Sequence, residues 1–287
     1  MRHTPALPVL RFWSAQGKYE HKVAGVGSFG VGAGASFGFR GVSPTATITA
    51  DDFGVSAAIN GAIEECLRKG LCSNASLMAN MPAFEEACEL SRRNGWADRI
   101  GLHLVLRDGA PLSNTIRSFP RFCGPDGQLR LTRPWRYVPR MVLSAPEQNA
   151  LAEEIRAQIR RCRDHGIRLC YVDSHYHLHT EWAIASVLIP IVKEECIPRV
   201  RLSRNCGRDL NLAKQLYKAL FNKRIQSAGL AGTRYFGSLE DYRHSRARPG
   251  SFEIMIHPAY APDGTLLAEP GGEPLEKALR QLGLNRG

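Results

Sequence analysis

Two adjacent aspartates follow a short stretch that is typical of a β-strand. Residues 46–50 form this stretch, and Asp51 and Asp52 come directly after it, shortly before Gly54. In parallel α/β proteins the chemically active groups lie at the carboxyl ends of the strands. Neighbouring carboxylates repel each other unless a cation or a proton lies between them. The pair therefore predicts a site that binds a cation or transfers a proton.

Histidines mark three further predicted strands. His103 lies within 101–104 (Gly-Leu-His-Leu), His175 lies within 173–179 (Asp-Ser-His-Tyr-His-Leu-His), and His257 precedes a proline near the end of the chain. An aspartate and two histidines from separate strands suit a borderline divalent ion such as Zn²⁺, with positions left open for water and substrate. A single strand histidine is more often a core residue than a ligand, so the prediction depends on their joint occurrence at strand ends.

The stretch after the fourth predicted strand holds two more histidines, His177 and His179. Its three imidazoles point the same way only if the strand continues through them. The alternatives are a surface strand with one polar face and a nonspecific metal-binding tract.

The chain around these residues alternates between predicted strands and helices. Short β-prone runs indicate the strands, and apolar residues at helical spacing indicate the helices. The predicted strands are 46–50, 72–79, 100–106, 168–173, 199–203, 233–236 and 252–257, and the predicted helices are 60–69, 83–94, 147–165, 181–195, 209–226 and 274–282. About seven mostly parallel strands with intervening helices predict an α/β protein, in which a distorted or incomplete (β/α) barrel fits better than an open sheet.

Two segments fall outside this alternation. Residues 1–43 include a Gly/Ser/Ala-rich run without period, and we interpret them as a flexible leader or as an upstream extension from a misassigned start. Residues 44–287 would then form a single barrel domain. The proline-rich residues 107–145 predict a long irregular insertion that covers a site.

The composition is that of an ordinary globular protein. Hydrophobic residues make up 44% and charged residues 23% of the 287 residues, which is enough for a substantial core. No apolar run is long enough to predict a transmembrane helix, and the first residues lack the apolar centre of a secretory signal. None of the eight cysteines forms a C-x-x-C pair, which argues against a zinc ribbon and favours a reducing cytoplasm.

Five motifs, in the same order along the chain, resemble the YdjC family of carbohydrate deacetylases, which includes chitooligosaccharide deacetylase and the hopanoid-associated deacetylase. The motifs are Thr-Ala-Asp-Asp-Phe-Gly at 49–54, Ser-Leu-Met-Ala-Asn at 76–80, Gly-Leu-His-Leu-Val-Leu at 101–106, Asp-Ser-His-Tyr-His-Leu-His at 173–179 and Glu-Ile-Met-Ile-His-Pro-Ala at 253–259. The similarity runs from about residue 45 to 262. It implies a distorted (β/α) barrel and the metal-dependent hydrolysis of an N-acetyl group on a sugar.

The resemblance also implies roles for individual residues. Asp52, His103 and His175 match the metal ligands. Asp51 matches the catalytic base, and His257 matches the general acid. The metal would be one divalent ion, with Zn²⁺ favoured by the ligand chemistry and Mg²⁺ as the alternative.

Three further residues are expected near the site without a fixed role. His177 and His179 match no ligand and would either support the ligands or contact the substrate. Arg201 would orient Asp51 or bind the substrate, and an exposed structural arginine is the alternative.

The net charge of +11 is concentrated in residues 198–249, which hold twelve Lys and Arg against three acids. This pattern indicates a solvated face, an anionic substrate such as a nucleotide-linked or lipid-phosphate-linked N-acetyl sugar, or a contact with a membrane surface. Nucleic acid is not expected, because no interleaved aromatic residues or helix-turn-helix pattern accompany the charge. The predicted helix within this segment is amphipathic: leucine and isoleucine would face inward (Leu212, Leu216, Leu220, Ile225) and polar residues outward (Lys214, Lys218, Asn222).

These observations favour a cytoplasmic, metal-dependent N-deacetylase of an N-acetylated sugar, oligosaccharide or glycan precursor, with a homodimer left open. A hydrolase of another bond, such as a phosphoester, is one alternative, because an Asp-His-His site does not dictate the bond that is cleaved. A non-catalytic basic carbohydrate-binding protein is the other, although the complete set of catalytic residue types argues against it.

Overall fold

The computed structural model describes residues 46–131, 142–207, 212–245 and 248–284. The predicted leader, residues 1–43, lies outside these ranges, as does part of the proline-rich insertion. The described segments belong to one compact unit, Ser43–Gly287.

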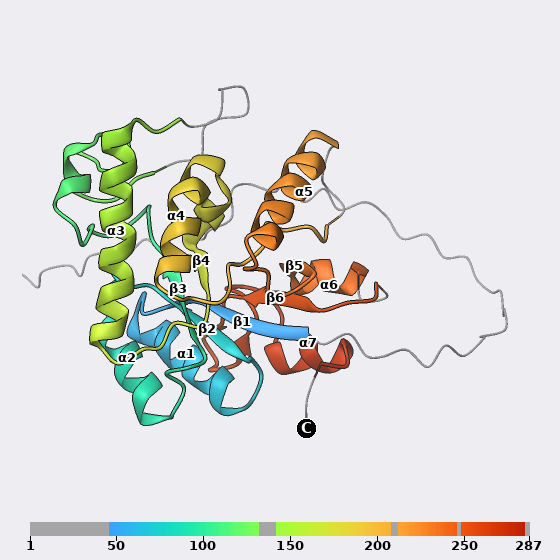
Figure 1. Cartoon of the computed structure of the whole chain (residues 1–287). Coiled ribbons are helices and arrows are strands. Elements are labelled where there is room, and N and C mark those ends of the chain that lie inside the picture. The colour runs from blue at the N-terminus through green and yellow to red at the C-terminus, as the bar shows by residue number, and fades with distance from the viewer. Residues whose placement is uncertain (1–45, 132–141, 208–211, 246–247, 285–287) are drawn as a thin grey trace, which may run out of the picture. The chain divides into compact units, whose positions relative to one another are not determined.

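A six-stranded parallel sheet organises this unit, with the strand order β4-β3-β2-β1-β6-β5 (Figure 1). Its strands are β1 (Ala46–Phe53), β2 (Asn74–Leu77), β3 (Ile100–Leu104), β4 (Val172–Ser174), β5 (Tyr235–Ser238) and β6 (Phe252–Ile256). The helices are α1 (Ala57–Arg68), α2 (Phe84–Arg93), α3 (Ala145–Asp164), α4 (Trp182–Glu194), α5 (Leu212–Ser227), α6 (Leu239–Ser245) and α7 (Leu275–Gln281), with the 3₁₀ turns η1 (Thr115–Ser118) and η2 (His175–Thr180). Two short strands, β7 (Ala259–Tyr260) and β8 (Leu266–Leu267), form a separate antiparallel pair.

The sheet curls into an incomplete barrel, which confirms the predicted fold class. Single-residue bridges connect Val200 to Val172 of β4 and to Ala231, just before β5, so one residue links the two edges of the sheet. The prediction of a strand over 199–203 is wrong except at Val200, because Val200 is the only residue of this segment that makes a β-bridge. A strand needs continuous backbone partners, and this segment has them only where the two edges approach each other.

Local sequence signals account for the helix ends. The Ser56 hydroxyl accepts a hydrogen bond from the backbone N–H of Ile59, so α1 begins three residues earlier than predicted. Ser144 and Glu147 form a capping box at the start of α3. Apolar side chains from these helices and from the sheet form a continuous buried core.

Helix α5 is oriented differently from the prediction. Leu212, Leu216 and Leu220 are exposed, whereas Asn222 is buried. The Asn222 side chain accepts a hydrogen bond from the Ser203 N–H at 2.8 Å and donates one to the Ser203 carbonyl at 3.0 Å. Asn222 thus satisfies a backbone that has no strand partner, and this requirement overrides the leucine pattern. Ile225 faces inward as predicted.

Gly101 of β3 offers a test of the packing inside the barrel. A Cβ atom at this position would lie 2.3 Å from the ring of the buried Tyr171. We expect Gly101→Ala to lower the free energy of unfolding by about 3 kcal/mol, measured by urea denaturation. The matched variant Gly61→Ala, in α1, has only an ordinary contact at 3.9 Å and should raise it by about 0.5 to 1 kcal/mol. Equal stability of the two variants would contradict this packing.

Candidate active site

A β-bulge at the end of β1 directs the two aspartates. Between Ala50 and Phe53 the pairing with β2 shifts by one residue, and Asp52 has a left-handed φ of 69°. In a regular strand adjacent side chains point to opposite faces. The bulge changes this alternation, so both Asp51 and Asp52 reach the neighbourhood of His103.

Asp52, His103 and His175 come together as a group that could hold a metal ion. Asp52 Oδ1 lies 3.3 Å from His103 Nε2 and 3.1 Å from His175 Nδ1. One ligand atom from each residue lies within 4.8 Å of the others. The three side chains come from β1, β3 and the turn after β4, so parallel strands of one sheet bring them to the carboxyl edge of that sheet.

The donor set fits a divalent cation. Asp52 Oδ1 is buried and has no hydrogen bond to any of the described residues, although two imidazole nitrogens lie close to it. An oxygen and two ring nitrogens that lie close together without forming hydrogen bonds to one another have the arrangement expected of three ligands around one metal ion. The buried surroundings contain the carboxylates of Asp51, Asp52, Asp173 and Glu253, and among the described residues Arg201 forms ion pairs with all of these except Asp52. A divalent ion would offset the remaining negative charge.

A second carboxylate orients each imidazole. His103 Nδ1 lies 2.7 Å from Asp173 Oδ1, and because a carboxylate only accepts, Nδ1 carries the proton and Nε2 is left to act as a ligand. His175 Nε2 lies 3.7 Å from Asp108 Oδ2, on the side of the ring away from Asp52.

Arg201 is buried rather than exposed, and it contacts three carboxylates. Its guanidinium donates to both oxygens of Asp51, at 2.7 and 2.9 Å. The same group lies 2.6 Å from Asp173 Oδ2, and its Nε donates to Glu253 Oε1 at 2.8 Å. Burial alone would raise the pKa of Asp51, but Arg201 holds that pKa well below its usual range. Asp51 is therefore fixed as a carboxylate.

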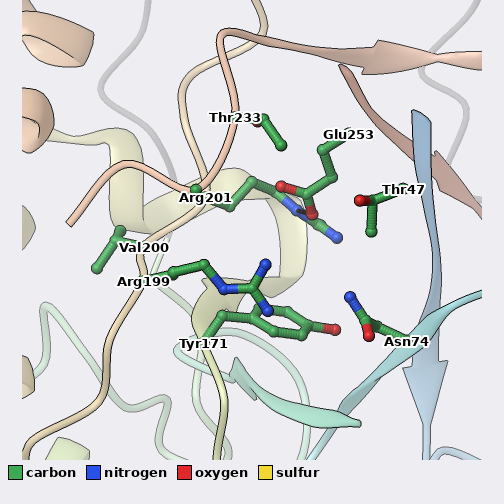
Figure 2. Close-up of a pocket in the computed structure, with 9 residues that line it drawn as sticks. Thr47, Asn74, Tyr171, Arg199, Val200, Arg201, Thr233 and Glu253 are labelled. Atoms are coloured by element: carbon green, nitrogen blue, oxygen red, sulfur yellow. Dashed lines mark hydrogen bonds and ion pairs between the residues drawn. The ribbon is translucent and has the colours of Figure 1, made fainter. Parts of the chain in front are cut away.

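On the side of the amino-terminal ends of the strands, the ion-pair network around Arg201 borders a small pocket (Figure 2). Residues at the amino-terminal ends of the strands line it, and Figure 2 shows the Arg201 guanidinium beside the Glu253 carboxylate. Burial raises the pKa of Glu253. Nearer the carboxyl ends of the strands, Ser76 Oγ lies 2.7 Å from the carboxylate of Asp173 and 2.9 Å from the Tyr171 hydroxyl.

His257 follows β6, the strand that pairs with β1. The register matches Ala50 with Ile256, so His257 comes next to the aspartates at the carboxyl edge.

The histidine run after β4 does not continue as a strand. Ser174 ends β4, and the chain turns through Tyr176 and His177, each with a left-handed φ of 55°. The turn separates the imidazoles, so that only His175 contacts Asp52. The His177 ring instead lies 5.6 Å from the ring of Phe236.

His179 is fully buried behind the site. Its Nε2 lies 3.1 Å from the Arg201 carbonyl, which can only accept, so Nδ1 accepts from the Ser174 hydroxyl at 2.7 Å. His179 therefore fixes the backbone that carries Arg201.

Sequence reasoning missed the carboxylates that support the site. Glu253 is an acid within the otherwise apolar stretch of β6, and a charged residue in a buried strand was the signal that indicated a partner. Asp173 and Ser76 lie inside the quoted motifs, but nothing in their spacing assigned them to His103 or Arg201.

The protonation of His103 predicts how metal affinity varies with pH. Burial alone would lower the pKa of His103, but Asp173 and Asp52 raise it to about 10, and the pKa of His175 is also raised. A cation needs neutral imidazoles, so binding at pH 7 should release protons, and affinity should rise about tenfold per pH unit for each proton released. Calorimetric titration of the metal-free protein with Zn²⁺, in buffers of different ionisation enthalpy, measures this release. Binding at pH 7 without proton release would contradict the assignment, and Asp52→Asn serves as the control with weakened binding.

Replacing Arg201 should destabilise the fold. Arg201→Met leaves three buried carboxylates without a counter-charge and should cost about 3 to 5 kcal/mol of unfolding free energy at pH 7. Arg201→Lys keeps the charge but not the bidentate contact and should cost less. The ion pair with Arg201 lowers the pKa of Asp51, so its contribution to the free energy of unfolding is present at neutral pH. This contribution is lost as the pH falls below the ordinary pKa of an aspartate toward the lowered pKa of Asp51. The deficit of Arg201→Met should therefore shrink in acid, and a deficit independent of pH would contradict this account.

Comparisons with known proteins show the family to which the chain belongs. The family model described as YdjC-like protein matches residues 45–281. A carbohydrate deacetylase of Brevibacillus brevis is 34% identical over 221 residues, covering 76% of this chain and 83% of the relative. A carbohydrate deacetylase of Halalkalibacterium halodurans is 30% identical over 213 residues, covering 74% of this chain and 84% of the relative.

A solved structure shares the fold. It is that of a protein described as a cellobiose-phosphate cleavage protein of Enterococcus faecalis V583, with a TM-score of 0.59 and 19% identity. The alignment covers 84% of this chain and 96% of the other. Taken with the family match over most of the chain, these findings show that the protein belongs to the YdjC-like family.

Proposed function

We propose that this protein is a metal-dependent hydrolase that removes the N-acetyl group from an N-acetylated sugar, oligosaccharide or glycan precursor. The observation that carries the proposal is the division of the aspartate pair. Asp52 faces two imidazoles, and Asp51 is held by Arg201. Hydrolysis of an amide needs both an electrophile for the carbonyl and a base for the water. The names of the relatives specify the substrate class, since both are carbohydrate deacetylases.

Asp52, His103 and His175 would hold the cation. A divalent ion there would polarise the acetamide carbonyl and lower the pKa of the attacking water. Two imidazoles among the three ligands favour Zn²⁺ over Mg²⁺, which prefers oxygen ligands.

Asp51 would accept the proton of the water. Arg201 keeps it ionised and fixes both of its oxygens, so the base keeps its position in each catalytic cycle. His257, on the neighbouring strand, would donate a proton to the leaving amine. His177 lies at the rim of the turn after β4 and would contact the substrate, whereas His179 would support Arg201 from behind.

The sugar carrier and the location of the enzyme are further parts of the proposal. The basic segment 198–249 supports an anionic carrier, such as a nucleotide or a lipid phosphate. All eight cysteines are free, which supports a reducing cytoplasm. Among the described helices none is long and apolar enough to cross a membrane. A homodimer stays a prediction from the sequence, and analytical ultracentrifugation of the purified protein would test it.

Asp51→Asn should separate catalysis from metal binding. The variant keeps the shape of the side chain but removes the base, so acetate release should fall by at least about a hundredfold while one metal ion still binds. Asp52→Asn should lose both the metal and the activity. The measurements are acetate release from N-acetylglucosamine oligomers, with and without chelator, and metal content. Turnover by Asp51→Asn near the wild-type rate would refute this assignment of the base, and release unaffected by chelator would refute the metal mechanism.

A further inference from the structure

Helix α5 carries a row of exposed leucines. Leu212, Leu216 and Leu220 are 83%, 63% and 50% exposed, and a spacing of four residues places them along one side of the helix. The row continues to Arg224, whose guanidinium lies 4.6 Å from the ring centroid of Trp182. Trp182 is itself exposed, so four of the six exposed large hydrophobic residues in the described part of the chain lie in or beside this row.

The amino-terminal part of α5 projects from the rest of the unit. Every residue of 212–216 is exposed, and Figure 1 shows this end of the helix standing away from the sheet. Farther along, Phe221, Asn222 and Ile225 anchor the helix. Helices in proteins are stabilised mainly by burying an apolar face, so an exposed row of leucines indicates that another surface binds there.

The positive charge of α5 indicates which kind of surface would bind the leucine row. Residues 212–227 contain four basic side chains and no acidic one. Helical spacing places Lys223 and Arg224 beside the leucine row, whereas Lys214 and Lys218 lie on the anchored side of the helix with Phe221. A second copy packed on the leucine face would bring the Lys223 and Arg224 side chains of the two helices together. Residues 1–43 also carry more bases than acids. An anionic bilayer suits both features, because the leucines would enter the boundary between headgroups and acyl chains while Lys223 and Arg224 lie near the phosphates.

The inner face of α5 is fixed to segments that build the active site. The Tyr217 hydroxyl donates to the carbonyl of Thr180, at the end of the histidine turn, at 2.8 Å. Asn222 holds both backbone groups of Ser203, two residues beyond Arg201. A surface that binds the outer face of α5 is therefore mechanically connected to the rim of the site.

We propose that α5 docks this protein on the anionic surface of a lipid bilayer by inserting Leu212, Leu216 and Leu220. Docking goes beyond the proposed deacetylation and does not depend on it. It would bring the site next to N-acetylated sugars carried by membrane lipids.

Vesicle sedimentation with the full-length protein tests the proposal. The wild type should bind vesicles of phosphatidylcholine and phosphatidylglycerol, bind pure phosphatidylcholine weakly, and lose binding as salt is added. The double variant Leu212→Ser/Leu216→Ser should bind the anionic vesicles about tenfold or more weakly, since it removes much of the inserted apolar surface. The matched control Val142→Ser removes a hydrophobic residue that is 79% exposed before α3, and it should bind as the wild type does.

Three results would overturn the proposal. They are a wild type that stays in the supernatant with anionic vesicles, a double variant that sediments as the wild type does, and a wild-type dimer that the double variant converts to monomers without any vesicle binding. The last result would assign the face to a second copy. Acetate release from a soluble N-acetylated oligosaccharide, measured on the same samples, should be equal in both proteins. Its absence in both would count against the proposed function and not against docking.

Discussion

The buried ion pair between Arg201 and Asp51 is the interaction on which the rest of the site depends. A guanidinium and several carboxylates taken out of water cost several kcal/mol each unless all of their hydrogen bonds are made. Here Asp51, Asp173 and Glu253 surround Arg201. These acids lie on β1, β4 and β6, whereas Arg201 lies on a segment that bridges the sheet edges through Val200 alone. The ion pairs therefore connect this short segment to three strands inside the barrel, in addition to the few backbone hydrogen bonds around Val200.

The same network explains why two adjacent acids can have different roles. Arg201 fixes Asp51 on one side, and the bulge turns Asp52 toward the imidazoles on the other. A left-handed φ at Asp52 is unfavourable for a residue with a side chain and is expected where the surrounding structure requires it. Asp173 connects the two halves, because one of its oxygens contacts His103 and the other contacts Arg201. A change at either half would be transmitted to the other through this carboxylate.

The sequence predicted the barrel and the cluster because both depend on local patterns. Alternation of apolar runs located the six parallel strands, and polar residues at their carboxyl ends located Asp52, His103 and His175, which the structure brings together. The rest depends on tertiary partners that no local pattern contains. Leucines at a spacing of four predict an inward face whether or not a partner exists, and in α5 the buried side is instead set by Asn222. Glu253 could be recognised as unusual in its strand, but not as a partner of the arginine.

The central claim is that the cation belongs to Asp52 and the base is Asp51. A crystal structure of the Zn²⁺-loaded protein, with anomalous data collected at the zinc edge, tests it most directly. The account predicts one anomalous peak within about 2.0 to 2.2 Å of Asp52, His103 Nε2 and His175, with Asp51 still paired to Arg201. A peak bonded to Asp51, or one that leaves out either histidine, would contradict it.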